Sequence, residues 1–154
     1  MPDLVDQDQD RDKDEEPGVT TYPSLLHTVL DTTEPRRLAE FYRELLGLRY
    51  RPGDEPPADG PDDADWLVLT DADGHRVLAF QQVERLEPTT WPTHDVPMQL
   101  HVDFTVRDIE ELERHRARAE ALGATLRLDR TDEEDEPLYV LADPSGHPFC
   151  LFVG

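Results

Sequence analysis

The sequence predicts an α+β fold built from two repeated βαβββ modules, and three recurring features support this prediction. A strand pattern followed by a helix pattern occurs twice along the chain. Each helix pattern ends at a glycine, Gly47 and Gly123. Each half then closes with an Asp-x-x-Gly-His turn, at Asp71 and at Asp143. Because these features recur in the same order, we interpret the chain as two modules packed about a pseudo-twofold axis.

Length and composition define the class of protein. The chain has 154 residues, enough for one compact domain with a sizeable core. Its 36 acidic and 15 basic residues give a formal charge of -21. The negative electrostatic field of such a charge repels phosphate backbones and anionic lipid, so nucleic-acid and membrane-surface binding are not expected. The single cysteine, Cys150, excludes an internal disulfide and fits a reducing cytosol.

The N-terminal segment, residues 1–20, is expected to be a disordered acidic tail. Its first 18 residues hold eight acids and almost no apolar side chains, which is too little burial to offset the entropy of ordering. The segment lacks the basic and apolar regions of a signal peptide, and no later stretch is apolar enough to span a membrane. We therefore expect a soluble cytoplasmic protein whose single domain covers residues 21–154.

Module one is expected at residues 24–84. Ser24 to Leu30 predicts a strand, and the cap-type residues from Asp31 to Pro35 predict the start of a helix. The helix has one apolar stripe at positions i, i+3, i+4, i+7 and i+8, made by Leu38, Phe41, Tyr42, Leu45 and Leu46. Three further strands are predicted at 48–51, 66–69 and 77–83, the last two forming a hairpin.

Module two is expected at residues 98–154, after a proline-rich linker at 85–97. Residues 99–106 alternate polar and apolar side chains, which predicts a strand with one face on a core. A helix from Asp108 to Leu122 follows, and its stripe is interrupted by Arg116. Strands are predicted at 124–128, 138–141 and 149–153. His75 and His147, which follow the turn glycines, are expected to face solvent.

Several motifs carry a resemblance to a known family. They are a histidine at the start of each module (His27 and His101), a helix ending in Leu-Gly, the Gln99-Leu100-His101-Val102-Asp103 strand and the closing Asp143-Pro144-Ser145-Gly146-His147-Pro148-Phe149-Cys150. With these motifs the chain resembles the vicinal oxygen chelate superfamily, the glyoxalase and bleomycin-resistance group, and in particular actinobacterial glyoxalase-like proteins. The resemblance implies a curled eight-stranded mixed sheet around a cavity, with the helices outside. It also implies a homodimer.

In metal-dependent members of this superfamily, each module supplies one ligand from its first strand and one from its last strand. His27 and His101 match the two first-strand positions. The glutamate expected on the last strand of module two is replaced by Cys150, and the repeat register places Leu78 at its counterpart in module one. The resemblance therefore implies two matching ligands, one thiol and one lost position.

Two interpretations of these residues remain open. His27, His101 and Cys150 form a three-ligand site for one divalent ion, with sulfur favouring zinc or another transition metal. Alternatively, no metal is bound, Cys150 is a small buried hydrophobe and the histidines are core or cavity residues. Asp103, two residues after His101 on the same strand face, is the acid/base candidate, or it orients His101 or accepts a hydrogen bond from a ligand.

A ligand cup is expected beside His101 and Asp103. Phe80 and Gln82 share a strand face with Leu78 by period two, which predicts that they face this cup. The alternative places Phe80 in the core and Gln82 near solvent. Trp91, between prolines of the linker, either walls the cup or pins the linker.

The leading functional hypothesis is a metal-free or weakly metal-binding protein that holds a small molecule in this cup. The competing hypothesis is a lyase, isomerase or dioxygenase that uses one divalent ion. A third is a structural or partner-binding role for the fold, with no ligand.

Overall fold

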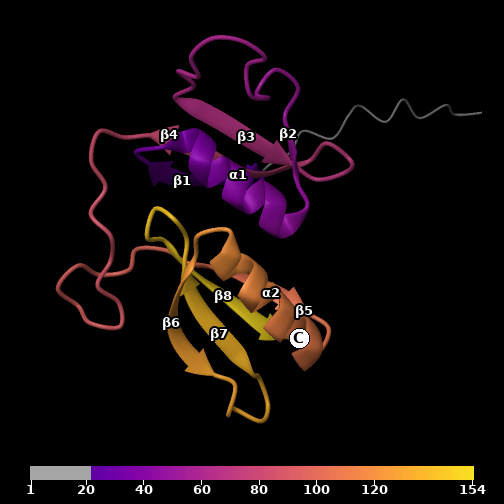
Figure 1. Cartoon of the computed structure of the whole chain (residues 1–154), viewed down its shortest axis with the longest axis vertical. Coiled ribbons are helices and arrows are strands. Elements are labelled where there is room, and N and C mark those ends of the chain that lie inside the picture. The colour runs from indigo at the N-terminus through magenta and orange to yellow at the C-terminus, as the bar shows by residue number, and fades with distance from the viewer. Residues whose placement is uncertain (1–21) are drawn as a thin grey trace, which may run out of the picture.

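The computed structural model describes residues 22–154, so the expected acidic tail lies outside the described residues. Module one contains β1 (Thr28–Thr32), α1 (Pro35–Leu46), β2 (Arg49–Tyr50), β3 (Trp66–Thr70) and β4 (Arg76–Gln82). Module two contains β5 (Val102–Val106), α2 (Ile109–Ala121), β6 (Thr125–Arg130), β7 (Leu138–Ala142) and β8 (Pro148–Val153). The predicted pair of βαβββ modules is confirmed, and Figure 1 shows them as two units placed one above the other.

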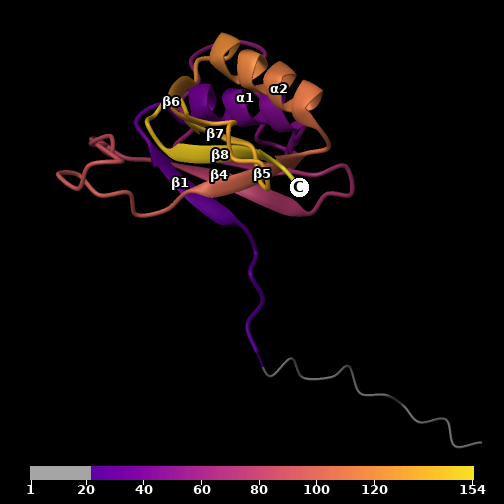
Figure 2. The same cartoon turned by 90° about the horizontal axis from the view of Figure 1, so that it is seen from below.

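The eight strands form two four-stranded mixed sheets with the same topology. Their strand orders are β1-β4-β3-β2 and β5-β8-β7-β6. In each sheet the first and last strands of the module pair in parallel, and the other neighbours pair antiparallel. Both helices lie on one side of the strands (Figure 2). Among the residues that the structure describes, no helix is long and apolar enough to cross a membrane.

Helix α1 forms where the apolar stripe predicts it. Pro35 at the first helical position carries no amide hydrogen that the helix would leave unpaired. Gly47 ends the helix with φ 66°, a left-handed conformation that glycine adopts without strain. Leu38 and Tyr42 on the stripe are 1% and 0% exposed, so the stripe is the packing face. In α2, Asp108 caps the helix by accepting a hydrogen bond of 2.8 Å from the backbone N–H of Glu111.

An aromatic cluster joins the two modules under α1. Tyr42 stacks on Phe80 of β4 at a centroid distance of 6.0 Å. Tyr42 also lies 6.2 Å from Phe149 and 6.3 Å from Phe104, on the strands of module two. Phe41 adds a contact of 5.9 Å to Phe149. Because burial of each such side chain contributes about 1.5–3 kcal/mol, this shared core holds the modules together.

The β7–β8 turn, residues 143–147, adds polar contacts between the modules. The buried hydroxyl of Tyr42 donates a hydrogen bond of 2.6 Å to Asp143. Asp143 also accepts the backbone N–H groups of Ser145 and His147 at 2.9 and 3.1 Å. Burial raises the pKa of Asp143, an effect that the Tyr42 hydrogen bond opposes. Ser145 shares a hydrogen bond of 2.8 Å with Thr32 of β1.

The last strands of the two modules, β4 and β8, differ by one residue in their pairing register. In module two the β7–β8 hairpin pairs without a shift of register. In module one a bulge between Leu69 and Thr70 shifts the β3–β4 register by one residue. The counterpart of Cys150 is therefore Ala79, and the assignment of Leu78 from the repeat register is wrong. Alanine, like leucine, offers no ligand atom to a metal.

The bulge also decides which face of β4 each side chain occupies. Leu78 and Phe80 are 3% and 0% exposed and pack with α1 in the hydrophobic core. Ala79 and Gln81 therefore lie on the opposite face of the sheet, since side chains alternate along a strand. A shift of one residue exchanges the two faces completely.

Candidate functional site

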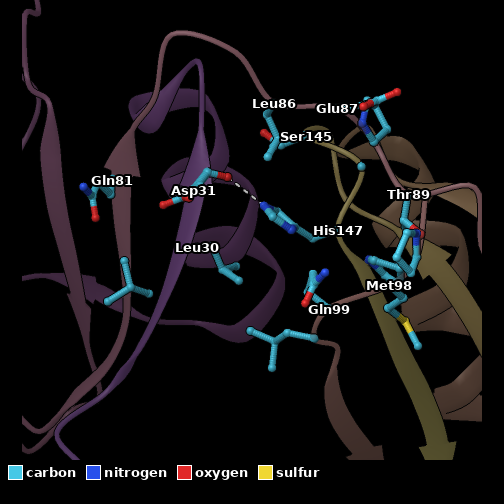
Figure 3. A pocket seen from close by; sticks show the side chains of 16 residues that line it. Leu30, Asp31, Gln81, Leu86, Glu87, Thr89, Met98, Gln99, Ser145 and His147 are labelled. Atoms are coloured by element: carbon cyan, nitrogen blue, oxygen red, sulfur yellow. Dashed lines mark hydrogen bonds between the residues drawn. The ribbon is translucent and has the colours of Figure 1, made fainter.

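A cavity of about 350 Å³ lies at the seam between the modules, and we call it the seam cavity. One wall comes from β1 and β4, a second from both ends of the linker, and a third from the β7–β8 turn, as Figure 3 shows. It is lined by Val29, Leu30, Asp31, Gln81, Leu86, Glu87, Pro88, Thr89, Pro97, Met98, Gln99, Leu100, Ser145, Gly146, His147 and Pro148. Its size and its mixture of apolar and polar walls are those of a small-molecule site.

His147 fixes the position of the turn at the seam cavity. Its ring Nε2 lies 2.6 Å from the backbone oxygen of Asp31 in β1 (Figure 3). A carbonyl oxygen only accepts, so Nε2 carries the proton and donates this hydrogen bond. The expectation that His147 faces solvent is therefore wrong, because the side chain bridges the modules and lines the cavity. His75, its counterpart in module one, is exposed, and its Nδ1 lies 3.2 Å from Oδ2 of Asp71.

A second group of polar side chains lies at the start of β5 and on β8. His101, Asp103 and Cys150 place one ligand atom each within 4.8 Å of one another. The parallel register sets Asp103 opposite Cys150, and His101 precedes Asp103 by two residues. The His101 Nε2 and Asp103 Oδ1 atoms are 3.3 Å apart. His101 and Asp103, which the sequence places on one strand face, thus lie together with Cys150, although none of the three lines the seam cavity.

The chemistry of this group depends on the Cys150 thiol. Burial raises the pKa of Cys150 to about 12, and the hydrogen bond and charge of Asp103 act in the same direction. The thiol is consequently protonated at neutral pH and is no ready nucleophile. A divalent ion would need to displace that proton in order to bind sulfur. Nitrogen, oxygen and sulfur donors in one group suit zinc better than magnesium or calcium.

His27 lies apart from that group. Its ring is 6.1 Å from the ring of Trp66, centroid to centroid. Nδ1 of His27 is buried and has no hydrogen-bond partner within residues 22–154. Burial lowers the pKa of His27, and the nearby charges of Arg76 and Arg51 lower it further. Within one chain, the structure does not unite His27 with the other two expected metal ligands.

The remaining expected cup residues lie elsewhere. Phe80 is part of the hydrophobic core, which confirms the alternative that places Phe80 in the core and Gln82 near solvent. The expectation that both face the cup is wrong, because the bulge turns the face of Leu78 and Phe80 towards the core. Gln82 is exposed near the start of α1, and Gln81 lines the seam cavity in its stead. Trp91 is half-buried in the middle of the linker, where its backbone N–H donates to Thr89 Oγ1 at 3.1 Å. It does not line the seam cavity.

Two βαβββ modules of this topology, with a polar group on the first and last strands, define the class of vicinal oxygen chelate proteins. A family model described as the glyoxalase-like domain matches residues 27–152. The chain therefore belongs to the glyoxalase-like domain family. Members of the superfamily bind small-molecule substrates, often form dimers and often hold a divalent metal. Among curated proteins, none is detectably similar to this chain in sequence.

Solved structures agree with the family at the level of the fold. The fosfomycin resistance protein FosX from Listeria monocytogenes is 16% identical, with a TM-score of 0.61 over 86% of this chain and 94% of its own. FosX from Mesorhizobium loti is 18% identical, with a TM-score of 0.59 over 86% and 93%. A glyoxalase/bleomycin resistance protein/dioxygenase family enzyme from Burkholderia phytofirmans is 16% identical, with a TM-score of 0.60 over 83% and 96%.

Proposed function

We propose that this protein binds a small molecule in the seam cavity, as a binding protein of the glyoxalase/bleomycin-resistance type. The observation that carries the proposal is the cavity itself, with about 350 Å³ of space between the modules. Val29, Leu86, Met98 and Leu100 provide apolar walls, and Gln81 contributes a polar side chain. A molecule bound there would contact both modules and the linker, so binding would also stabilise their association.

Substitution of Val29 by tryptophan is expected to weaken binding of an apolar probe, phenylbutanol, by about tenfold or more. Val29 is 37% exposed and lines the cavity, so the indole would fill part of its space. Isothermal titration calorimetry measures the effect. Leu126→Trp is the matched control, because Leu126 is 36% exposed on a strand outside the cavity.

Equal affinity of Val29→Trp and wild type would contradict the seam cavity as the binding site. If the wild-type protein gives no heat with phenylbutanol and no thermal shift with related apolar molecules, small-molecule binding fails, and the structural or partner-binding role of the fold gains support.

A second function is favoured by the group on β5 and β8. His101, Asp103 and Cys150 would hold one divalent ion, and such an ion supplies Lewis-acid polarisation of substrate oxygens. We expect zinc at one ion per chain in this case, measured by mass spectrometry on protein purified without a tag or chelator. His101→Ala and Cys150→Ser should each abolish the metal, whereas His94→Ala should retain it. Protein free of metal even after dialysis against zinc would contradict this function.

We also propose that the protein forms a homodimer. Tyr22, Leu25 and Leu26, in the segment before β1, are 80%, 90% and 60% exposed. Members of this superfamily often form dimers, and a second copy of the chain would cover this apolar segment.

The double substitution Leu25→Ser and Leu26→Ser is expected to shift the protein from dimer to monomer. Light scattering after size exclusion should give the mass of two 17.7 kDa chains for the wild type and one for the variant. Ile109→Ser, which removes an exposed apolar side chain at α2, is the control and should remain dimeric. A monomeric wild type at all concentrations would contradict the dimer.

A further inference from the structure

Some polar side chains of the seam cavity have hydrogen-bond partners within the protein, and others have none. Asp31 and Glu87 both line it, and within the described chain no hydrogen bond or ion pair engages either carboxylate. The side-chain amides of Gln81 and Gln99 are likewise without a partner in residues 22–154. These four side chains are therefore available to a bound molecule.

The other polar side chains that line the cavity already form hydrogen bonds within the protein. The Nε2 proton of His147 goes to the backbone oxygen of Asp31. Ser145 shares its hydroxyl bond with Thr32 at 2.8 Å. Thr89 donates its hydroxyl to the backbone oxygen of Val96 at 2.7 Å. The side chains left free in the cavity are consequently two carboxylates, which when ionised only accept hydrogen bonds, and two amides, which donate and accept them.

The charge of the cavity walls also favours a ligand that donates hydrogen bonds. No lysine or arginine is among the residues that line the cavity, whereas two carboxyl groups, those of Asp31 and Glu87, are. The whole chain carries a formal charge of -21, which adds an attractive field for cations and a repulsive one for anions. A ligand that presents charged donors would satisfy the free acceptors.

We propose that the ligand of the seam cavity is an apolar molecule that carries a cationic amine, as an ammonium or a guanidinium group. This inference rests on the proposed function and names the class of ligand. The amine lies against the carboxylate of Asp31 or that of Glu87, which belong to different walls of the cavity (Figure 3). The apolar part lies against Leu86, Met98 and Leu100.

Three probes of nearly equal shape test the proposal: phenylbutylamine, phenylbutanol and phenylbutyrate. Calorimetry at low ionic strength is expected to give about tenfold tighter binding for the amine than for the alcohol, and the weakest binding for the carboxylate. Salt at about 0.5 M should reduce this preference several-fold, because the carboxylates are open to solvent.

Asp31→Asn combined with Glu87→Gln should remove most of the amine's advantage and leave the affinity for the alcohol within about twofold. Glu84→Gln combined with Asp95→Asn is the matched control. It changes the net charge by the same amount at two exposed side chains outside the cavity, and it should keep the preference.

Each other outcome overturns a defined part of the account. Equal binding of amine and alcohol, or tighter binding of the carboxylate, overturns the cationic class while the binding function stands. Loss of the preference in the control variant shows that it comes from the overall charge, which also overturns the proposal. If none of the three probes binds, the proposed function itself fails.

Discussion

Replacement of Asp143 by alanine is expected to lower the free energy of unfolding by about 3–5 kcal/mol. Asp143 is 4% exposed and accepts three hydrogen bonds, from Tyr42 and from the backbone N–H groups of Ser145 and His147. Its removal leaves the hydroxyl of Tyr42, a fully buried side chain, without its partner. It also loosens the turn that joins module two to module one.

Asp71→Ala is the matched control in module one. Asp71 accepts the backbone N–H groups of Asp73 and His75 in the same kind of turn, at an exposed site that contacts no residue of the other module by hydrogen bonding. This variant should lower the free energy of unfolding by only about 1 kcal/mol. Urea unfolding followed by circular dichroism measures both. Equal losses for the two variants would show that the inter-module contact of Asp143 contributes little.

Gly146→Ala is expected to lower the free energy of unfolding by about 2–5 kcal/mol. Gly146 has φ 93°, where an L-residue is strained by about 1–2 kcal/mol. A Cβ at this position would in addition lie 2.8 Å from Cβ of Pro88 in the linker, so the linker must shift. Both residues line the seam cavity, and the variant should therefore also bind phenylbutanol more weakly.

Gly74→Ala separates the two causes. Gly74 occupies the same position of the module-one turn with φ 85°, and nothing lies within 4 Å of its added Cβ. This variant should show only the strain of about 1–2 kcal/mol and unchanged probe binding. Thermal unfolding and calorimetry of both variants test the comparison. Equal behaviour of the two would contradict packing of the linker on the β7–β8 turn.

The fold could be predicted from the sequence because its signals are local. The stripe of α1, the glycine after it and the two Asp-x-x-Gly-His turns each report on a few neighbouring residues, and all are confirmed. The eight strands of the expected mixed-sheet fold are divided between two four-stranded sheets, and no strand of one module pairs with a strand of the other among the described residues. Pairing between modules depends on tertiary packing, which no local pattern records.

The faces of β4 could not be predicted for a physical reason. Val77, Leu78, Ala79 and Phe80 are all apolar, so period two does not distinguish the inner from the outer face. The Asp-x-x-Gly-His turn has the same spacing in both modules, so the sequence carries no sign of the bulge that shifts the register in module one. For this reason it could not be predicted that Gln81, and not Gln82, lines the cavity.

The seam cavity itself lay beyond sequence reasoning. Much of its wall is the linker, whose residues between β4 and β5 form no helix or strand and have no periodic pattern. The contact of His147 with the backbone of Asp31 joins residues 116 positions apart. Strand alternation, in contrast, predicts that His101 and Asp103 share a face, and the family motif predicts Cys150 near His101. The expected ligand set also included His27, which lies apart, and did not include Asp103.

Location of a bound probe tests the central claim most directly. In a titration of ¹⁵N-labelled protein with phenylbutanol and phenylbutylamine, the largest amide shifts should occur at Asp31, Leu100 and Gly146, which line the seam cavity. Shifts centred on Asp103 and Cys150, with the seam cavity unaffected, would contradict the account and place the ligand on the open strands of module two.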